Sequence, residues 1–98
     1  MDISYRTNKL EKVCTDASIA ERKYGIEMAE KLQQRIEQIK AADSVETMIK
    51  FKIGRCHPLH QNRKEQYAMD LVHPYRLVFE KIGNITKIVK IIEIVDYH

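Results

Sequence analysis

The 98-residue sequence contains no tryptophan, and it has only two prolines, three glycines and two cysteines. So few prolines and glycines leave no linker rich in these residues, and we expect a single domain over residues 1–98. The chain is too short for an enzyme with a separate nucleotide-binding domain. Its 44% hydrophobic and 32% charged residues are typical of a small soluble domain.

Long hydrophobic runs are also missing, since no run approaches the ~20 apolar residues that cross a bilayer. No membrane span or membrane partner is therefore expected. The first residues, Met1 to Arg6, lack the basic start and apolar stretch of a secretory signal. We therefore expect a cytoplasmic protein, in which Cys14 and Cys56 are reduced thiols rather than a disulfide.

Several catalytic motifs are missing as well. A glycine-rich phosphate loop and a serine in a nucleophile elbow are both absent, which leaves ATP-driven chemistry and serine hydrolysis without support. Cys56, His57 and His60 lie close together, but structural zinc commonly needs two close ligand pairs, and the chain has no second Cys/His pair. We expect neither a metal nor a cofactor.

The first half of the chain has the periodicity of a helix. Apolar residues recur there at steps of three, four and three, at Ala29, Leu32, Ile36 and Ile39. This pattern predicts a long helix over 18–42, after a shorter one over 7–15. Asp43-Ser44 resembles an N-cap and predicts a brief helical turn after it, and residues 3–5 predict a short leading strand.

The second half changes to the period of a β-strand. Apolar and polar residues alternate over 67–71 and 75–79, on either side of His73-Pro74. A third strand over 85–95 alternates poorly, so it is central, buried on both faces, or bulged. Helices followed by an antiparallel meander predict the α+β class.

Positive charge is concentrated in residues 49–64, although the whole chain has a net charge of only +3. This segment holds five cations and no acid, a net charge of +5. The other residues hold twelve cations and fourteen acids, a net charge of −2. Such a stretch, with His57 and His60 within it, suits the phosphates of a polyanion. A solvated loop is the alternative, because charge runs of this size are commonly no more than that.

The last three residues, Asp96-Tyr97-His98, bring ionisable side chains together where the last predicted strand ends. A carboxylate can orient and charge an imidazole, and a phenol can donate a hydrogen bond, so the group is suited to acid–base catalysis. The alternative is an ordinary polar tail after a core strand.

Five stretches carry a resemblance to a known family: Arg55-Cys56-His57-Pro58-Leu59, Asn62-Arg63-Lys64, residues 66–71, residues 74–79 and Asp96-Tyr97-His98. Together they resemble the RelE/ParE superfamily of toxins from type II toxin–antitoxin systems, in its HigB or plasmid-maintenance killer branch. The resemblance covers residues 50–98 by motif and the helical half by architecture.

This resemblance implies a RelE-like α+β fold with N-terminal helices packed on a C-terminal curved antiparallel sheet. It also implies metal-independent, ribosome-dependent cleavage of mRNA, an endoribonuclease activity that inhibits translation. The implied partners are mRNA on the ribosome and a cognate helix-turn-helix antitoxin of the HigA type.

Carried over residue by residue, the resemblance assigns catalysis to His57, Arg76, Asp96, Tyr97 and His98. It assigns binding of RNA and phosphate to Arg55, His60, Arg63 and Lys64. The sequence departs from the family where His60 replaces a usual cation, where Gln61 replaces a frequent glycine, and where Tyr67 and Tyr75 stand in for tryptophans.

Metal-free RNA cleavage needs a base for the 2′-OH proton, an acid for the leaving 5′-oxygen and cations for the charged phosphorane. We expect Asp96 or His98 to be the base and His57 or the other terminal residue to be the acid, with the two labels interchangeable. Arg76, helped by a cation at position 63 or 64, would clamp the phosphate, because its fork can meet two oxygens at once.

Two other functions remain open. A ParE-like toxin would bind and poison a DNA topoisomerase without cleaving nucleic acid, although such chains usually lack clustered acid–base residues at the terminus. A non-catalytic RNA-binding protein would use the same basic stretch. Independently of these functions, the alternative role of Arg76 is a pair with Glu80 on its strand, and the alternative role of His57 is that of a turn residue.

Overall fold

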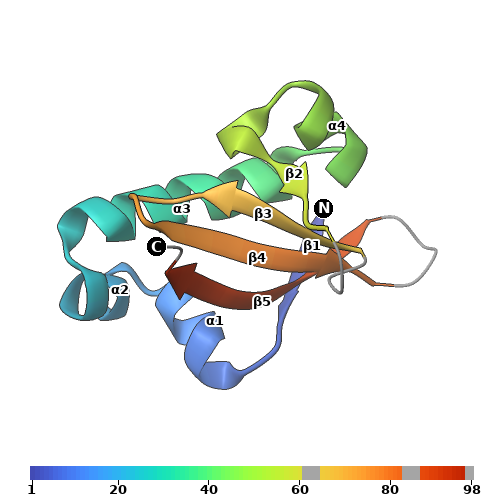
Figure 1. Cartoon of the computed structure of the whole chain (residues 1–98). Coiled ribbons are helices and arrows are strands. Elements are labelled where there is room, and N and C mark those ends of the chain that lie inside the picture. The colour runs from blue at the N-terminus through green and yellow to red at the C-terminus, as the bar shows by residue number, and fades with distance from the viewer. Residues whose placement is uncertain (61–64, 83–86, 97–98) are drawn as a thin grey trace.

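A computed structural model describes residues 1–60, 65–82 and 87–96 of the chain. In chain order it contains β1 (Asp2–Tyr5), α1 (Asn8–Thr15), α2 (Ala17–Tyr24), α3 (Ile26–Ala41), α4 (Val45–Lys50), a single 3₁₀ turn (Ile53–Arg55), β2 (His57–Pro58), β3 (Gln66–Asp70), β4 (Tyr75–Lys81) and β5 (Ile88–Asp96). Within the described residues the strands form one five-stranded sheet in the order β1-β5-β4-β3-β2 (Figure 1). The predicted α+β class is confirmed.

The sheet is antiparallel except at one edge. β1 runs parallel to β5, whereas β5, β4, β3 and β2 pair antiparallel in turn. The predicted leading strand is therefore confirmed, and it extends the sheet beyond the C-terminal meander. No helix in the described part of the chain is long and apolar enough to cross a bilayer.

The helix predicted over 18–42 is interrupted at Gly25, which separates α2 from α3. Gly25 has φ of 93° and ψ of 166°, a conformation that ends the helical ladder and that glycine adopts without a Cβ clash. The apolar periodicity from Ala29 to Ile39 lies wholly within α3, so it could not reveal the break.

Side-chain caps begin two of the other helices. The hydroxyl of Thr7 accepts a hydrogen bond from the backbone N–H of Leu10 at 3.1 Å, and that of Ser44 accepts one from Thr47 at 3.1 Å. Each cap satisfies an amide that would otherwise lack an intrahelical partner. The predicted first helix and the turn predicted after residue 43 are thereby confirmed as α1 and α4.

β5 lies between β1 and β4, and it contains a bulge. Val78 of β4 is opposite Glu93, but Phe79 is opposite Ile91, so Ile92 is an extra residue on β5. An extra residue shifts every later side chain to the other face of the strand. This bulge and the central position explain why the sequence of the third predicted strand alternates poorly.

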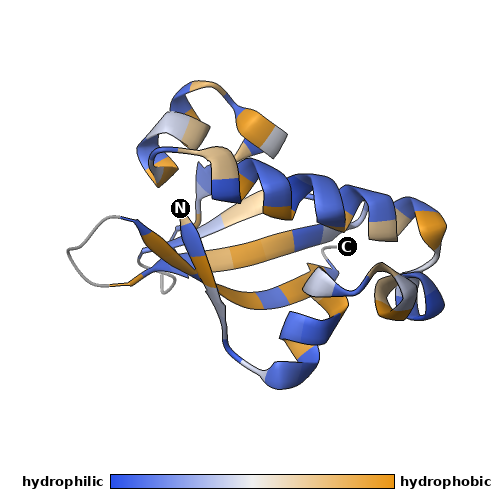
Figure 2. Cartoon of the chain, turned by 180° about the vertical axis from the view of Figure 1, so that it is seen from behind, coloured by the Kyte–Doolittle hydropathy of each residue, from blue (hydrophilic) through white to orange (hydrophobic). Residues whose placement is uncertain are grey.

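The helices cover one face of the sheet and bury the core there. The buried side chains that pack together include Leu32 and Ile39 of α3 and Met69, Leu77, Phe79 and Ile91 of the sheet. Burying one such side chain contributes about 1.5–3 kcal/mol. The outward surface of α3 is largely hydrophilic (Figure 2). The face of the sheet away from the helices carries polar pairs such as Asp70 opposite Arg76.

Candidate functional site

The sheet face away from the helices carries His57 and Arg76, from two of the stretches that carry the family resemblance. β2, His57–Pro58, is only two residues long. It lies within the basic stretch of residues 49–64, for which a solvated loop is the alternative prediction. His57 is opposite Ala68, which is opposite Val78, and the neighbouring row holds Asp70 opposite Arg76. Directly paired residues share a face. His57 and Arg76 therefore lie on the same face, in adjacent rows.

Asp70 joins two arginines at this face. Its Oδ2 is 2.8 Å from Nε of Arg55, and its Oδ1 is 3.6 Å from Nε of Arg76. The Arg55 side chain is 68% exposed, whereas those of Arg76 and Asp70 are only 30% and 33% exposed. Exposed ion pairs contribute at most about 1 kcal/mol to stability. The two contacts therefore fix the directions of the guanidinium groups more than they stabilise the fold.

A cavity of about 270 Å³ opens beside this cluster, where β3 turns into β4. Its lining consists of Arg55, Asp70, Leu71, His73, Pro74, Tyr75 and Arg76. Two guanidinium groups outweigh one carboxylate in it, so the cavity has an excess positive charge. Such a cavity suits an anion, because arginine binds phosphate oxygens through parallel N–H donors.

The loop before β2 has a left-handed backbone. Lys52, Gly54 and Arg55 have φ values of 53°, 56° and 53°. For residues other than glycine this conformation costs about 1–2 kcal/mol each. The N–H of Cys56 donates to the carbonyl of Ile53 at 2.9 Å and closes the turn. The turn carries Arg55 to Asp70 and brings its carbonyl beside the next histidine.

The ring of His57 is oriented by this carbonyl. Nδ1 lies 2.7 Å from the backbone oxygen of Arg55. A carbonyl oxygen only accepts hydrogen bonds, so Nδ1 must carry the proton in the neutral ring. Nε2 is then the nitrogen that can take up and release a proton.

Asp96 lies at the same end of the sheet but in a different orientation. The residue of β5 opposite Arg76 is Val95, and Asp96 is opposite Tyr75. Tyr75 belongs to the helix-covered face, where its ring meets Tyr24 of α2 edge-on at 5.3 Å. Paired residues share a face. Asp96 therefore lies on the helix-covered side of the sheet, one residue beyond Val95, the partner of Arg76.

Five predicted site residues remain. His60 is exposed just after β2. Arg63, Lys64, Tyr97 and His98 lie outside the described residues, and their roles stay predictions.

Neither thiol is available as a nucleophile in the folded chain. Burial raises the pKa of Cys14 and of Cys56 to about 12, so both are protonated at neutral pH. Across residues 1–60, 65–82 and 87–96 no three His, Cys, Asp or Glu side chains are grouped as metal ligands would be.

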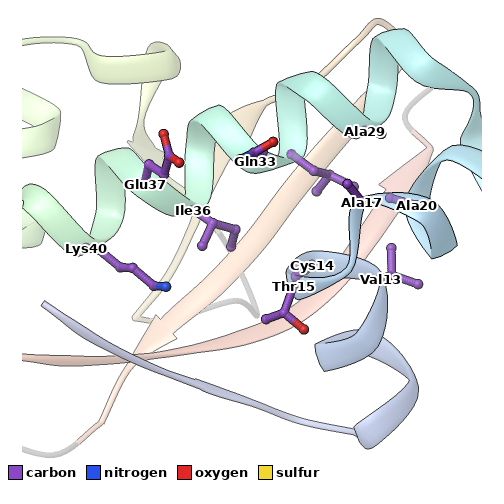
Figure 3. A pocket seen from close by; sticks show the side chains of 11 residues that line it. Val13, Cys14, Thr15, Ala17, Ala20, Ala29, Gln33, Ile36, Glu37 and Lys40 are labelled. Atoms are coloured by element: carbon purple, nitrogen blue, oxygen red, sulfur yellow. The ribbon is translucent and has the colours of Figure 1, made fainter.

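A second cleft, of about 200 Å³, lies between α1, α2 and α3 (Figure 3). Val13, Ala20 and Ile36 contribute to its mostly apolar lining, which includes Glu37 and Lys40 but no histidine or arginine. It therefore lacks the imidazole and the paired guanidinium groups found at the sheet. The sheet face is therefore the candidate site.

Two members of the site escape prediction from the sequence, Asp70 and Arg35. Asp70 is one polar residue of an alternating strand, and only the register of the hairpin places it opposite Arg76. Arg35 comes from α3, and its Nε donates to the backbone oxygen of Asp70 at 2.6 Å. Desolvation lowers the pKa of Arg35, and the nearby Asp70 carboxylate opposes that shift. No local sequence signal indicates this long-range contact.

Comparison with known proteins identifies the fold. No protein-family model and no curated protein matches the chain. Solved structures do match. The YoeB toxin of the Staphylococcus aureus YoeB–YefM complex has a TM-score of 0.66 at 19% identity, over 100% of this chain and 97% of that one. A YoeB/ParE toxin from Agrobacterium tumefaciens has a TM-score of 0.66 at 14% identity, over 100% of both chains. The chain thus has the fold of YoeB-type toxins.

Proposed function

We propose that this chain is the toxin of a type II toxin–antitoxin system and that it cleaves mRNA on the ribosome without a metal. The observation that carries the proposal is that His57 and Arg76 lie in neighbouring rows of one sheet face, with Arg55 held to that face by Asp70. The fold shared with YoeB-type toxins supports the same class. The motifs of residues 55–98 favour the HigB branch.

The chemistry follows from the positions of these groups. Arg55 and Arg76 approach the cavity from a loop and a strand, so a phosphodiester placed there would meet donors from two sides. Charge that develops on the phosphorane is stabilised by such preorganised donors. His57 acts through Nε2 and serves as the acid when its ring carries both protons. Of the two terminal candidates for the base, His98 is preferred to Asp96, because the register places Asp96 on the helix-covered side of the sheet. Tyr97 stacks on a base of the unpaired mRNA.

An antitoxin is part of the proposal. The S. aureus relative is found in a toxin–antitoxin complex with YefM, including a heterotetrameric one. The HigB-like motifs instead favour a helix-turn-helix partner of the HigA type. Which of the two kinds neutralises this chain is decided by co-expression with each. Action on the ribosome would place the protein in the cytoplasm.

The test is to express the wild-type and His98→Ala chains in growing cells and to map transcript ends by primer extension. We expect cuts in phase with codons inside translated regions, and their loss in the variant. Growth arrest with intact transcripts would contradict the proposal. Arg22→Ala, which removes an exposed cation of α2, is the control for charge alone.

The ParE-like alternative is kept because one structural neighbour is described as a YoeB/ParE toxin. It predicts damaged DNA, intact transcripts and no effect of His98→Ala. The same cultures distinguish the two functions when DNA breaks are measured beside transcript ends.

A further inference from the structure

We propose that Asp70 is the positioning residue of this site, which aims Arg55 and Arg76 together at the cavity between β3 and β4. The inference rests on the proposed function, because positioning matters only if the arginines act on a phosphate. Asp70 itself would not touch the substrate.

The geometry gives Asp70 one oxygen for each arginine. Oδ2 holds Arg55 at 2.8 Å, and Oδ1 faces Arg76 at 3.6 Å. Oδ1 is buried and has no hydrogen bond within the described part of the chain. An unsatisfied buried carboxylate oxygen is costly, so it favours an approach of the Arg76 guanidinium. We expect this contact to shorten when substrate engages Arg76, as contacts in unliganded sites commonly do.

Arg35 holds the strand from which Asp70 projects. Its Nε donates to the backbone oxygen of Asp70 at 2.6 Å, and one terminal nitrogen donates to Oε1 of Gln38 at 2.9 Å. The guanidinium of Arg35 also lies against Gly54, where a Cβ would come within 2.7 Å of Nε. One side chain of α3 therefore packs against the left-handed loop and the end of β3, the two segments that carry Arg55 and Asp70.

Stability does not account for this arrangement. The pair between Arg55 and Asp70 is largely exposed on the arginine side, and such pairs contribute at most about 1 kcal/mol. Orientation is worth more, because a displacement of about 1 Å in a reacting group can cost a hundredfold in rate. The arrangement is thus better explained by the direction of the guanidinium groups.

The test uses the whole chain and the variant Asp70→Asn, which keeps the size of the side chain but removes its charge. The exchange of each arginine Nε–H with solvent is followed by NMR. We expect exchange at Arg55, whose Nε lies 2.8 Å from Asp70, to accelerate about tenfold, while Arg35, which donates to a backbone oxygen, stays within about twofold. Arg35 is thus an internal control.

The functional arm measures mRNA cleavage on ribosomes. We expect Asp70→Asn to lower kcat about 10- to 100-fold with little change in KM, and Asp70→Glu to recover part of the loss. Glu80→Gln removes a carboxylate from the same face, opposite Gln66, and should leave both readouts unchanged. Thermal melting of each variant checks that it folds.

Two results would overturn the inference: unchanged exchange at Arg55 in Asp70→Asn, or altered exchange with unchanged kcat. Failure of the proposed function is a different outcome. The wild-type chain would then cleave no mRNA, while the exchange measurement would still decide whether Asp70 orients Arg55.

Discussion

Replacing Arg76 by lysine tests whether the site needs only a positive charge at this position or also the two parallel N–H donors of the guanidinium group. Lysine keeps the positive charge but cannot present two parallel N–H donors to a phosphate. If the fork makes one charged hydrogen bond that lysine cannot make, about 1.5–3 kcal/mol of transition-state stabilisation is lost. Each 1.36 kcal/mol corresponds to a factor of ten, so kcat should fall roughly 10- to 150-fold.

The free energy of unfolding should change much less. The contact of Arg76 with Asp70 is long, at 3.6 Å, and both side chains are about one-third exposed. A pair of this kind contributes at most about 1 kcal/mol. Urea unfolding of Arg76→Lys should therefore stay close to that of the wild type.

The assay is single-turnover cleavage of an mRNA bound to purified ribosomes, with the product measured over time. Arg22→Lys makes the same chemical change on an exposed part of α2 and should cleave at the wild-type rate. If Arg76→Lys cleaves as fast as wild type while Arg76→Ala is inactive, charge alone suffices, and the reasoning about the fork is wrong.

Three further predictions concern binding, strain and the thiols. RNA affinity should fall with a log–log salt slope of about −0.7 per phosphate contact, and Arg55→Ala should make the slope shallower by about that amount in a filter-binding titration; an unchanged slope would exclude Arg55 as a contact. Gly25→Ala and Gly54→Ala should each destabilise the fold by about 1–3 kcal/mol, because both glycines have a positive φ that alanine adopts only with strain, and at Gly54 the new Cβ would also come within 2.7 Å of the Arg35 side chain. A urea midpoint equal to that of the wild type for either variant would contradict this. Burial raises the pKa of Cys56 to about 12, so iodoacetamide at pH 8 should label it only after unfolding; rapid labelling of the native chain, seen by mass spectrometry, would be the opposite result.

Much of the fold can be predicted because local patterns determine it. Alternation in residues 67–71 and 75–79 predicts β3 and β4, and the N-cap pattern of Asp43-Ser44 predicts the start of α4. The break at Gly25 and the strand β2 do not follow from periodicity. A single glycine is tolerated within many helical patterns, and two residues are too few to show a period.

The site is predictable in part for a similar reason. His57 and Arg76 lie within motifs, so a resemblance can identify them. Asp70 is identified only by the strand register, and Arg35 only by a contact 35 residues away in sequence. Contacts of this kind depend on tertiary packing, which no local window of sequence contains.

The most direct test of the central claim, a cation-lined site that uses the 2′-OH of mRNA as nucleophile, is cleavage of two ribosome-bound messages. One is all-ribose, and the other has a single 2′-deoxynucleotide at the mapped cut. We predict that the first is cut to leave a 2′,3′-cyclic phosphate and that the second is intact at that position. Equal cutting of both messages, or of neither, would contradict the claim.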